Sequence, residues 1–203
     1  MKTKIILPII AVLVAGFIYF SQSEGESLEE YTPLIELLRK EKDEFMKTSS
    51  ESPFKSAKES YIGLNYFPAN LDFKVRAKIE PITSKSFLTL STSSGEKEKY
   101  LKHSFAIFEL NGQEYRLLLL KKATGKQNEA IFTAFADDTS GKLTYGGGRY
   151  LDLTFKNANK IDLDFNLSYN PYCAYNGTFS CPFPPPENVL PIAIEAGEKS
   201  YHD

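Results

Sequence analysis

The sequence is poor in the residues on which most metal and catalytic sites depend. Its 203 residues include two histidines, two cysteines and no tryptophan. His103 and His202 have no ligand spacing to Cys173 and Cys181, and a structural zinc ion usually takes four ligands. No Gly-x-Ser-x-Gly motif marks a serine nucleophile. We therefore expect no bound metal, no cofactor and no serine hydrolase.

A strong charge of one sign and repeated sequence are absent as well. The formal net charge is -2, and 25% of the residues are charged. A nucleic-acid-binding domain carries a basic face, so nucleic acid is not an expected partner. No stretch has low complexity, and no internal repeat of a solenoid period is found. Without residues 1–24, the length fits a single domain with its own core.

An uncharged and mostly apolar run lies close to the N-terminus. Residues 5–20 follow Lys2 and Lys4, and a charged start before an apolar run is typical of secretory signals. As a helix this run would be roughly 24 Å long, slightly short for a membrane span. We expect residues 1–24 to be a single-pass membrane anchor, with a cleaved signal peptide as the alternative. Either way, the rest of the chain would lie in the cell envelope, on the extracytoplasmic side.

A helix is expected after a polar linker at residues 25–31. Thr32 is a suitable N-cap, and Pro33 fits the first helical position. The helical spacing predicts that one apolar stripe packs on the domain, while Arg39 and Asp43 face water. The stripe consists of Leu34, Leu37, Leu38 and Phe45.

From residue 72 onward, apolar and polar residues alternate, which is typical of half-buried strands. Asn111-Gly112 predicts a two-residue hairpin turn, and the unbroken run from Leu117 to Leu120 predicts a strand buried on both faces. About eight strands are expected, near residues 73–80, 86–91, 100–110, 114–121, 130–135, 149–155, 161–165 and 189–194. Their local order favours an antiparallel barrel or sandwich with an N-terminal helix. Residues 32–203 would thus form a single, mainly β domain.

The last third of the chain contains a series of short, specific motifs. They are Gly148-Arg149-Tyr150, Asp164-Phe165-Asn166, Tyr169-Asn170-Pro171-Tyr172-Cys173-Ala174-Tyr175, Cys181-Pro182, Pro185-Pro186-Glu187-Asn188 and Ala196-Gly197-Glu198-Lys199. This series resembles a bacterial family of uncharacterised proteins, known as a domain of unknown function, and the resemblance covers approximately residues 44–201. It implies a shared site but brings no activity, cofactor or partner with it.

Cys173 and Cys181 lie on either side of a short loop. In an oxidising compartment such a pair can form a disulfide, which would stabilise the fold by about 2–3 kcal/mol in the chain-entropy model. We expect this disulfide. The alternatives are a metal site completed by Asp164 or Glu187, a reactive thiol beside Arg149, and two unrelated structural thiols.

Arg149 and the polar residues after it form the candidate ligand site. The three glycines before Arg149 can expose backbone N–H groups to an anion, and arginine can bind phosphate or carboxylate in a bidentate way. The favoured alternative is an internal ion pair of Arg149 with Asp152 or Asp164. Asparagines can satisfy the backbone of irregular loops, and tyrosines can line a pocket or cover one end of the core. The candidate residues are Arg149, Tyr150, Asp164, Asn166, Tyr169, Asn170, Glu187 and Asn188.

Two functions remain open from the sequence. The first is a binding or scaffolding module, which is favoured because no nucleophile–base pair or metal set is recognisable. The second is an enzyme acting on a small anionic substrate, with Arg149 orienting the anion and Asp164 or Glu187 as acid or base. Both place the site where the triglycine turn meets the proline-rich C-terminal segments.

Overall fold

The structure, a computed structural model, describes residues 26–55, 61–123, 131–155 and 159–202. In these ranges the chain forms one α-helix, α2 (Leu28–Thr48), and six strands. The strands are β1 (Lys74–Ser91), β2 (Lys97–Leu110), β3 (Gln113–Lys122), β4 (Ile131–Phe135), β5 (Arg149–Leu153) and β6 (Lys160–Asp164). The short 3-10 helices are η1 (Pro53–Lys55), η2 (Leu71–Phe73), η3 (Phe165–Leu167), η4 (Tyr172–Ala174) and η5 (Pro186–Asn188).

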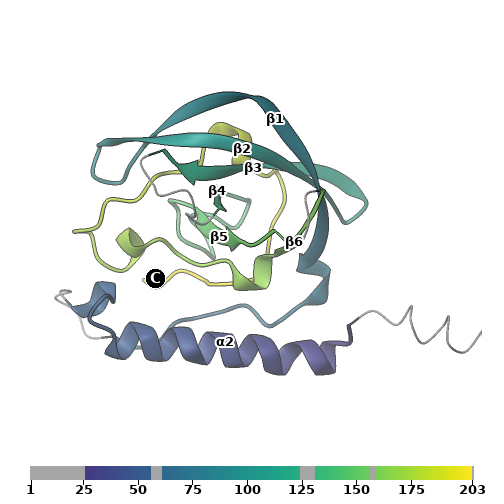
Figure 1. Cartoon of the computed structure of the whole chain (residues 1–203). Helices are drawn as coiled ribbons and strands as arrows, with labels where there is room; N and C mark the ends of the chain where they lie inside the picture. Colours follow the sequence, from purple (N-terminus) through teal and green to yellow (C-terminus); the bar gives the residue numbers. More distant parts are fainter. Residues whose placement is uncertain (1–25, 56–60, 124–130, 156–158, 203) are drawn as a thin grey trace, which may run out of the picture.

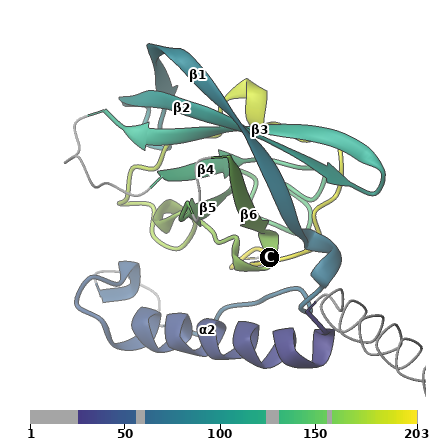
Figure 2. The same ribbon diagram turned by 45° about the vertical axis from the view of Figure 1, so that its right-hand side comes forward.

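The six strands form one antiparallel sheet in the order β5-β4-β3-β2-β1-β6. The sheet curls into a half-barrel, and α2 lies along one side of it (Figures 1 and 2). The segment after β6 reaches the opposite edge of the sheet. There Tyr150 N donates to Tyr169 O at 2.8 Å, and Tyr169 N donates to Tyr150 O at 2.9 Å. The prediction of a mainly β, antiparallel fold with an N-terminal helix is confirmed.

The number of strands is lower than predicted for two reasons. The strands expected at residues 73–80 and 86–91 are one long strand, β1, whose register against β2 is irregular between Pro81 and Ser86. The strand expected at residues 189–194 is instead irregular chain with a single bridge, from Val189 to Ala136. Pro191 lies in that segment, and a proline cannot donate to a strand ladder.

Local signals in the middle of the sheet are confirmed. Asn111 and Gly112 have φ values of 54° and 74°, as a tight two-residue hairpin turn between β2 and β3 requires. The run from Leu117 to Leu120 is fully buried. Leu117 and Leu119 belong to the main core, while Leu118 and Leu120 pack on the other face of the sheet.

The helix begins earlier than predicted. Ser27 is the N-cap and forms a capping box with Glu30, an arrangement that satisfies two backbone N–H groups at the helix start. Thr32 and Pro33 therefore lie inside α2, and residues 28–31 of the expected linker are helical.

The predicted packing face of α2 is wrong. Tyr31, Ile35 and Met46 are the buried residues of the helix, whereas the predicted stripe is exposed by 36–53%: Leu34, Leu37, Leu38 and Phe45. Polar contacts explain why a face other than the predicted one packs on the domain. Arg39 donates to Phe67 O at 2.9 Å, and Lys42 pairs with Glu198 at 2.7 Å, so charged residues lie on the face that meets the domain.

The expected membrane attachment is corrected by the structure. In the four described ranges no helix is both long enough and apolar enough to cross a membrane. A membrane partner and an extracytoplasmic location therefore have no support. The apolar run at residues 5–20, on which both expectations were based, lies outside the described residues.

Candidate functional site

Arg149, the first residue of β5, points into the core instead of toward a ligand. Its side chain is fully buried and is ion-paired with Asp137, with Nη2 donating to Oδ2 at 2.8 Å. The guanidinium also donates to the carbonyl oxygens of Ile194, Ala196 and Glu198. Burial lowers the pKa of Arg149, and the Asp137 carboxylate opposes this shift. Arg149 thus forms an internal ion pair, as the alternative predicted, although the partner is Asp137 and not Asp152 or Asp164. Its bonds to the three carbonyl groups hold the C-terminal segment to the sheet.

The two carboxylates proposed for acid–base work are engaged elsewhere. The Tyr31 hydroxyl donates to Asp164 at 2.7 Å and 2.8 Å, which fixes α2 to the end of β6. Glu187 accepts from Lys102 at 3.1 Å near the surface. Each side chain of the predicted enzyme set, Arg149 with Asp164 or Glu187, is thus paired with a different partner. Among the described residues, no group of three or more acidic, histidine or cysteine side chains could hold a metal ion.

The three candidate asparagines satisfy backbone groups. Asn188 accepts from Leu118 N and donates to the carbonyl oxygens of Leu118 and Ala134. Asn166 accepts from Asn70 N and donates to Asn70 O. Asn170 Nδ2 donates to Lys199 O at 2.8 Å. These side chains therefore hold loops in place, although the buried Oδ1 of Asn170 has no hydrogen-bond partner.

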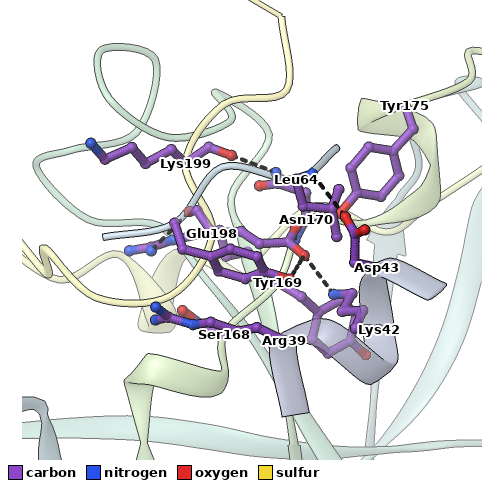
Figure 3. Close-up of polar contacts among 12 residues, drawn as sticks. Arg39, Lys42, Asp43, Leu64, Ser168, Tyr169, Asn170, Tyr175, Glu198 and Lys199 are labelled. Atoms are coloured by element: carbon purple, nitrogen blue, oxygen red, sulfur yellow. Dashed lines mark hydrogen bonds and ion pairs between the residues drawn. The ribbon is translucent and has the colours of Figure 1, made fainter. Parts of the chain in front are cut away.

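Glu198 is the centre of a buried polar network that the sequence analysis did not identify as a site. Its side chain accepts hydrogen bonds from Asn170 N at 2.8 Å and from the Tyr175 hydroxyl. Lys42 pairs with its other oxygen at 2.7 Å, and the Tyr66 hydroxyl donates to that oxygen at 3.4 Å. Figure 3 shows Glu198 together with Lys42 of α2, Asn170 and Tyr175. The motif Ala196-Gly197-Glu198 was the available signal.

A cavity of about 660 Å³ lies beside this network. Its lining comes from α2, from β2, β3 and β5, and from the chain between residues 167 and 182. Two candidate residues, Tyr150 and Tyr169, line it. The other aromatic and apolar residues of the lining include Phe45, Met46, Tyr100, Leu167, Tyr172 and Phe179.

The two central tyrosines are rigidly held. The Tyr150 hydroxyl donates to Pro182 O at 2.6 Å, and the Tyr169 hydroxyl donates to Asp152 at 3.0 Å. Their rings meet edge to face, with centroids 6.0 Å apart. The Lys42 ammonium lies 4.3 Å from the centre of the Tyr169 ring. Burial raises the pKa of both tyrosines, and the Asp152 carboxylate adds to the shift at Tyr169, so the hydroxyls stay protonated and the rings are neutral.

The triglycine turn and the C-terminal segment do meet, as predicted. Gly148 has a φ of 83°, and a Cβ there would lie 2.5 Å from Pro184 and 2.6 Å from Phe135 O. Glycine is therefore required by both the backbone conformation and the close approach. The contact is a packing contact, because Arg149 turns away from it into the core.

The expected disulfide is not supported, since Cys173 and Cys181 are free thiols. The two residues nevertheless lie together: Cys173 N donates to Cys181 Sγ at 3.2 Å. Cys181 lines the cavity. Tyr145, and not Arg149, is a polar neighbour of Cys173, with its hydroxyl 3.8 Å from Cys173 Sγ.

Comparison with known proteins agrees with the motifs of the last third. The model of a family described as a protein of unknown function (DUF1684) matches residues 59–199. The solution NMR structure of an uncharacterized protein from Haloarcula marismortui is similar, with a TM-score of 0.67 and 34% identity over 86% of this chain and 97% of that chain. No curated protein matches the chain. The chain therefore belongs to the DUF1684 family of proteins of unknown function.

Proposed function

We propose that the protein binds a small, flat and largely apolar molecule in the cavity between α2 and β5. The observation that carries this proposal is the cavity itself. Its volume of about 660 Å³ lies within the range of typical ligand sites, roughly 300–1,000 Å³. Ligand sites are also mostly apolar and aromatic with a few placed polar groups, and the lining has this composition.

The tyrosine rings define the shape of the expected ligand. The hydroxyls of Tyr150 and Tyr169 are occupied by Pro182 O and Asp152. The rings themselves are therefore the parts of these residues that remain for a ligand. Aromatic rings favour offset-stacked or edge-to-face contacts with other rings, so a flat aromatic molecule fits this surface.

Lys42 defines the expected polar contact of the ligand. A lysine ammonium has three N–H donors, and the bond to Glu198 uses one of them. The charges of the lining balance, since it contains two lysines, Lys42 and Lys122, and two acids, Glu98 and Asp152. We therefore expect a neutral ligand with one hydrogen-bond acceptor, such as a carbonyl or hydroxyl oxygen, directed at Lys42.

Leu167→Trp tests the proposal by narrowing the cavity. Leu167 lines the cavity and is 38% exposed, so a larger side chain can be accommodated without disturbing the core. The probe is N-phenyl-1-naphthylamine, a neutral aromatic dye that fluoresces in apolar sites. We expect it to bind the wild-type protein, and to bind the variant at least about tenfold more weakly, a difference of about 1.4 kcal/mol.

Leu37→Trp is the matched control. Leu37 is 53% exposed on α2 and does not line the cavity, so the dye should bind this variant as it binds the wild type. Because the sequence has no tryptophan, the introduced residue is also a unique fluorescent reporter in each variant. Absence of dye binding to the wild type, or equal affinity in both variants, would refute the proposed site.

A further inference from the structure

The fold holds Cys173 and Cys181 side by side outside the sheet. Cys173 lies in η4, while Cys181 is attached to the turn between β1 and β2. Ser93 N donates to Cys181 O at 2.9 Å, and Cys181 N donates to Ser93 Oγ at 3.1 Å. Cys173 N in turn donates to Cys181 Sγ at 3.2 Å. The relative position of the two cysteines is thus set by backbone hydrogen bonds.

The two thiols have different environments. Cys173 is partly exposed, whereas Cys181 is buried. A hydrogen bond from the Cys181 thiol lowers the pKa of Cys173 to about 6, and the same bond raises the pKa of Cys181. The Tyr145 hydroxyl, 3.8 Å from Cys173 Sγ, also favours the thiolate. At neutral pH the pair therefore consists of an accessible thiolate and a protonated thiol, and the thiolate is the nucleophilic form.

We propose that Cys173 and Cys181 form a peroxide-reducing pair in which Cys173 attacks and Cys181 resolves. The Cys173 sulfur attacks one oxygen of hydrogen peroxide and the O–O bond breaks. Cys173 becomes a sulfenic acid, and the departing hydroxide takes up a proton and leaves as water. Cys181 then loses its proton, and its sulfur attacks the sulfenic sulfur. The S–S bond forms, the S–O bond breaks, and the second hydroxide leaves as water with that proton.

In the net reaction of the two steps, two thiols are oxidised to one disulfide and one hydrogen peroxide is reduced to two waters. Deprotonation of Cys181 becomes easier once Cys173 has become a sulfenic acid. The hydrogen bond to Cys173 is the main cause of the raised pKa of Cys181, and formation of the sulfenic acid removes the thiolate that accepts this bond. A dithiol such as dithiothreitol would then return the pair to its reduced form and would itself become a disulfide.

Mass spectrometry of the full-length protein after one equivalent of hydrogen peroxide tests the pair. We expect the wild type to lose the mass of two hydrogens, and dithiothreitol to restore them. Cys181→Ser should stop at a sulfenic acid that dimedone traps on Cys173. Cys173→Ser should react at least about tenfold more slowly, because the remaining thiol of Cys181 is buried and reaction with peroxide needs an accessible sulfur. Equal rates in the two variants, or oxygen uptake by the wild type without a disulfide, would overturn the proposal.

Alkylation of the unmodified protein gives a measurement that does not depend on the folding of a variant. Iodoacetamide should label Cys173 before Cys181 in the folded protein, as read by peptide mass spectrometry. The rate at Cys173 should fall as the pH decreases through about 6. Equal labelling of both cysteines, or a rate that follows an ordinary thiol pKa of about 8.5, would rule out Cys173 as the attacking residue.

Discussion

Replacing Arg149 with methionine removes the side chain that holds the C-terminal segment to β5. The guanidinium is fully buried, pairs with Asp137 at 2.8 Å, and donates to the carbonyl oxygens of Ile194, Ala196 and Glu198. Methionine fills much of the same space with an unbranched apolar chain. The variant therefore leaves a buried carboxylate without its cation and three carbonyl groups without this donor.

The expected loss follows from the burial of the pair. Removing one partner of a buried ion pair costs roughly 3–5 kcal/mol. Asp137 keeps bonds from Thr139 N at 2.8 Å and Thr139 Oγ1 at 2.6 Å, which limit the loss, while the three carbonyl groups add to it. We therefore expect a decrease of about 4 kcal/mol in the free energy of unfolding. For a chain of this size that corresponds to a Tm lower by roughly 8–16 °C.

Thermal unfolding followed by circular dichroism measures this effect, with Arg76→Met as the matched control. Arg76 pairs with Asp162 at 3.1 Å, but its side chain is 69% exposed. An exposed ion pair contributes no more than about 1 kcal/mol, so the control should melt close to the wild type. If the Tm of Arg149→Met lies within about 2 °C of the control, the buried clamp does not support the C-terminal segment and the reasoning fails.

Two further variants test the polar network and the triglycine turn. Lys42→Met leaves buried Glu198 without its ammonium partner, so urea unfolding should show a decrease of roughly 3–5 kcal/mol in the free energy of unfolding. The control is Lys40→Met at an exposed position, which should lower this free energy by less than about 0.5 kcal/mol. Equal urea midpoints for the two variants would contradict the role of Lys42. Gly148→Ala should cost more than Gly95→Ala. The two glycines have almost the same φ, 84° at Gly95 and 83° at Gly148. A Cβ added at Gly148 would lie 2.5 Å from Pro184, whereas a Cβ at Gly95 would meet no atom within 4 Å. The Gly95 variant thus reports backbone strain alone, roughly 1–2 kcal/mol, and equal losses would show that the contact with Pro184 is not tight.

Much of the sheet could be predicted because its signals are local. Alternation of apolar and polar residues identifies strands wherever one face is buried, and β2, β3, β4, β5 and β6 lie close to their predicted ranges. Asn111-Gly112 predicts its turn because few residues adopt positive φ in two successive positions. The extra strands arose where a local signal was incomplete: the irregularity after Pro81 does not end β1, and the apolar segment around Pro191 has no partner ladder.

The candidate site was less predictable because its parts are polar and distant in sequence. Arg149 stands out in the sequence because it follows three glycines, but its partner could be any acid that packing brought near. The role of Lys42 is not predictable from the sequence, since a lysine on an amphipathic helix usually faces water. It lies on the contact face because the domain presents the buried Glu198 carboxylate there.

Sequence patterns alone were enough to predict the antiparallel β class, the hairpin at Asn111-Gly112, the burial of β3 on both faces and the family of unknown function. Each of these depends on residue pattern and backbone preference, which act over a few neighbouring positions. The pairing of Arg149 with Asp137, the packing face of α2, the cavity and the proximity of the two thiols emerged from the folded chain. These depend on which groups meet across the fold, because a buried charge or polar group must find a partner wherever packing places it.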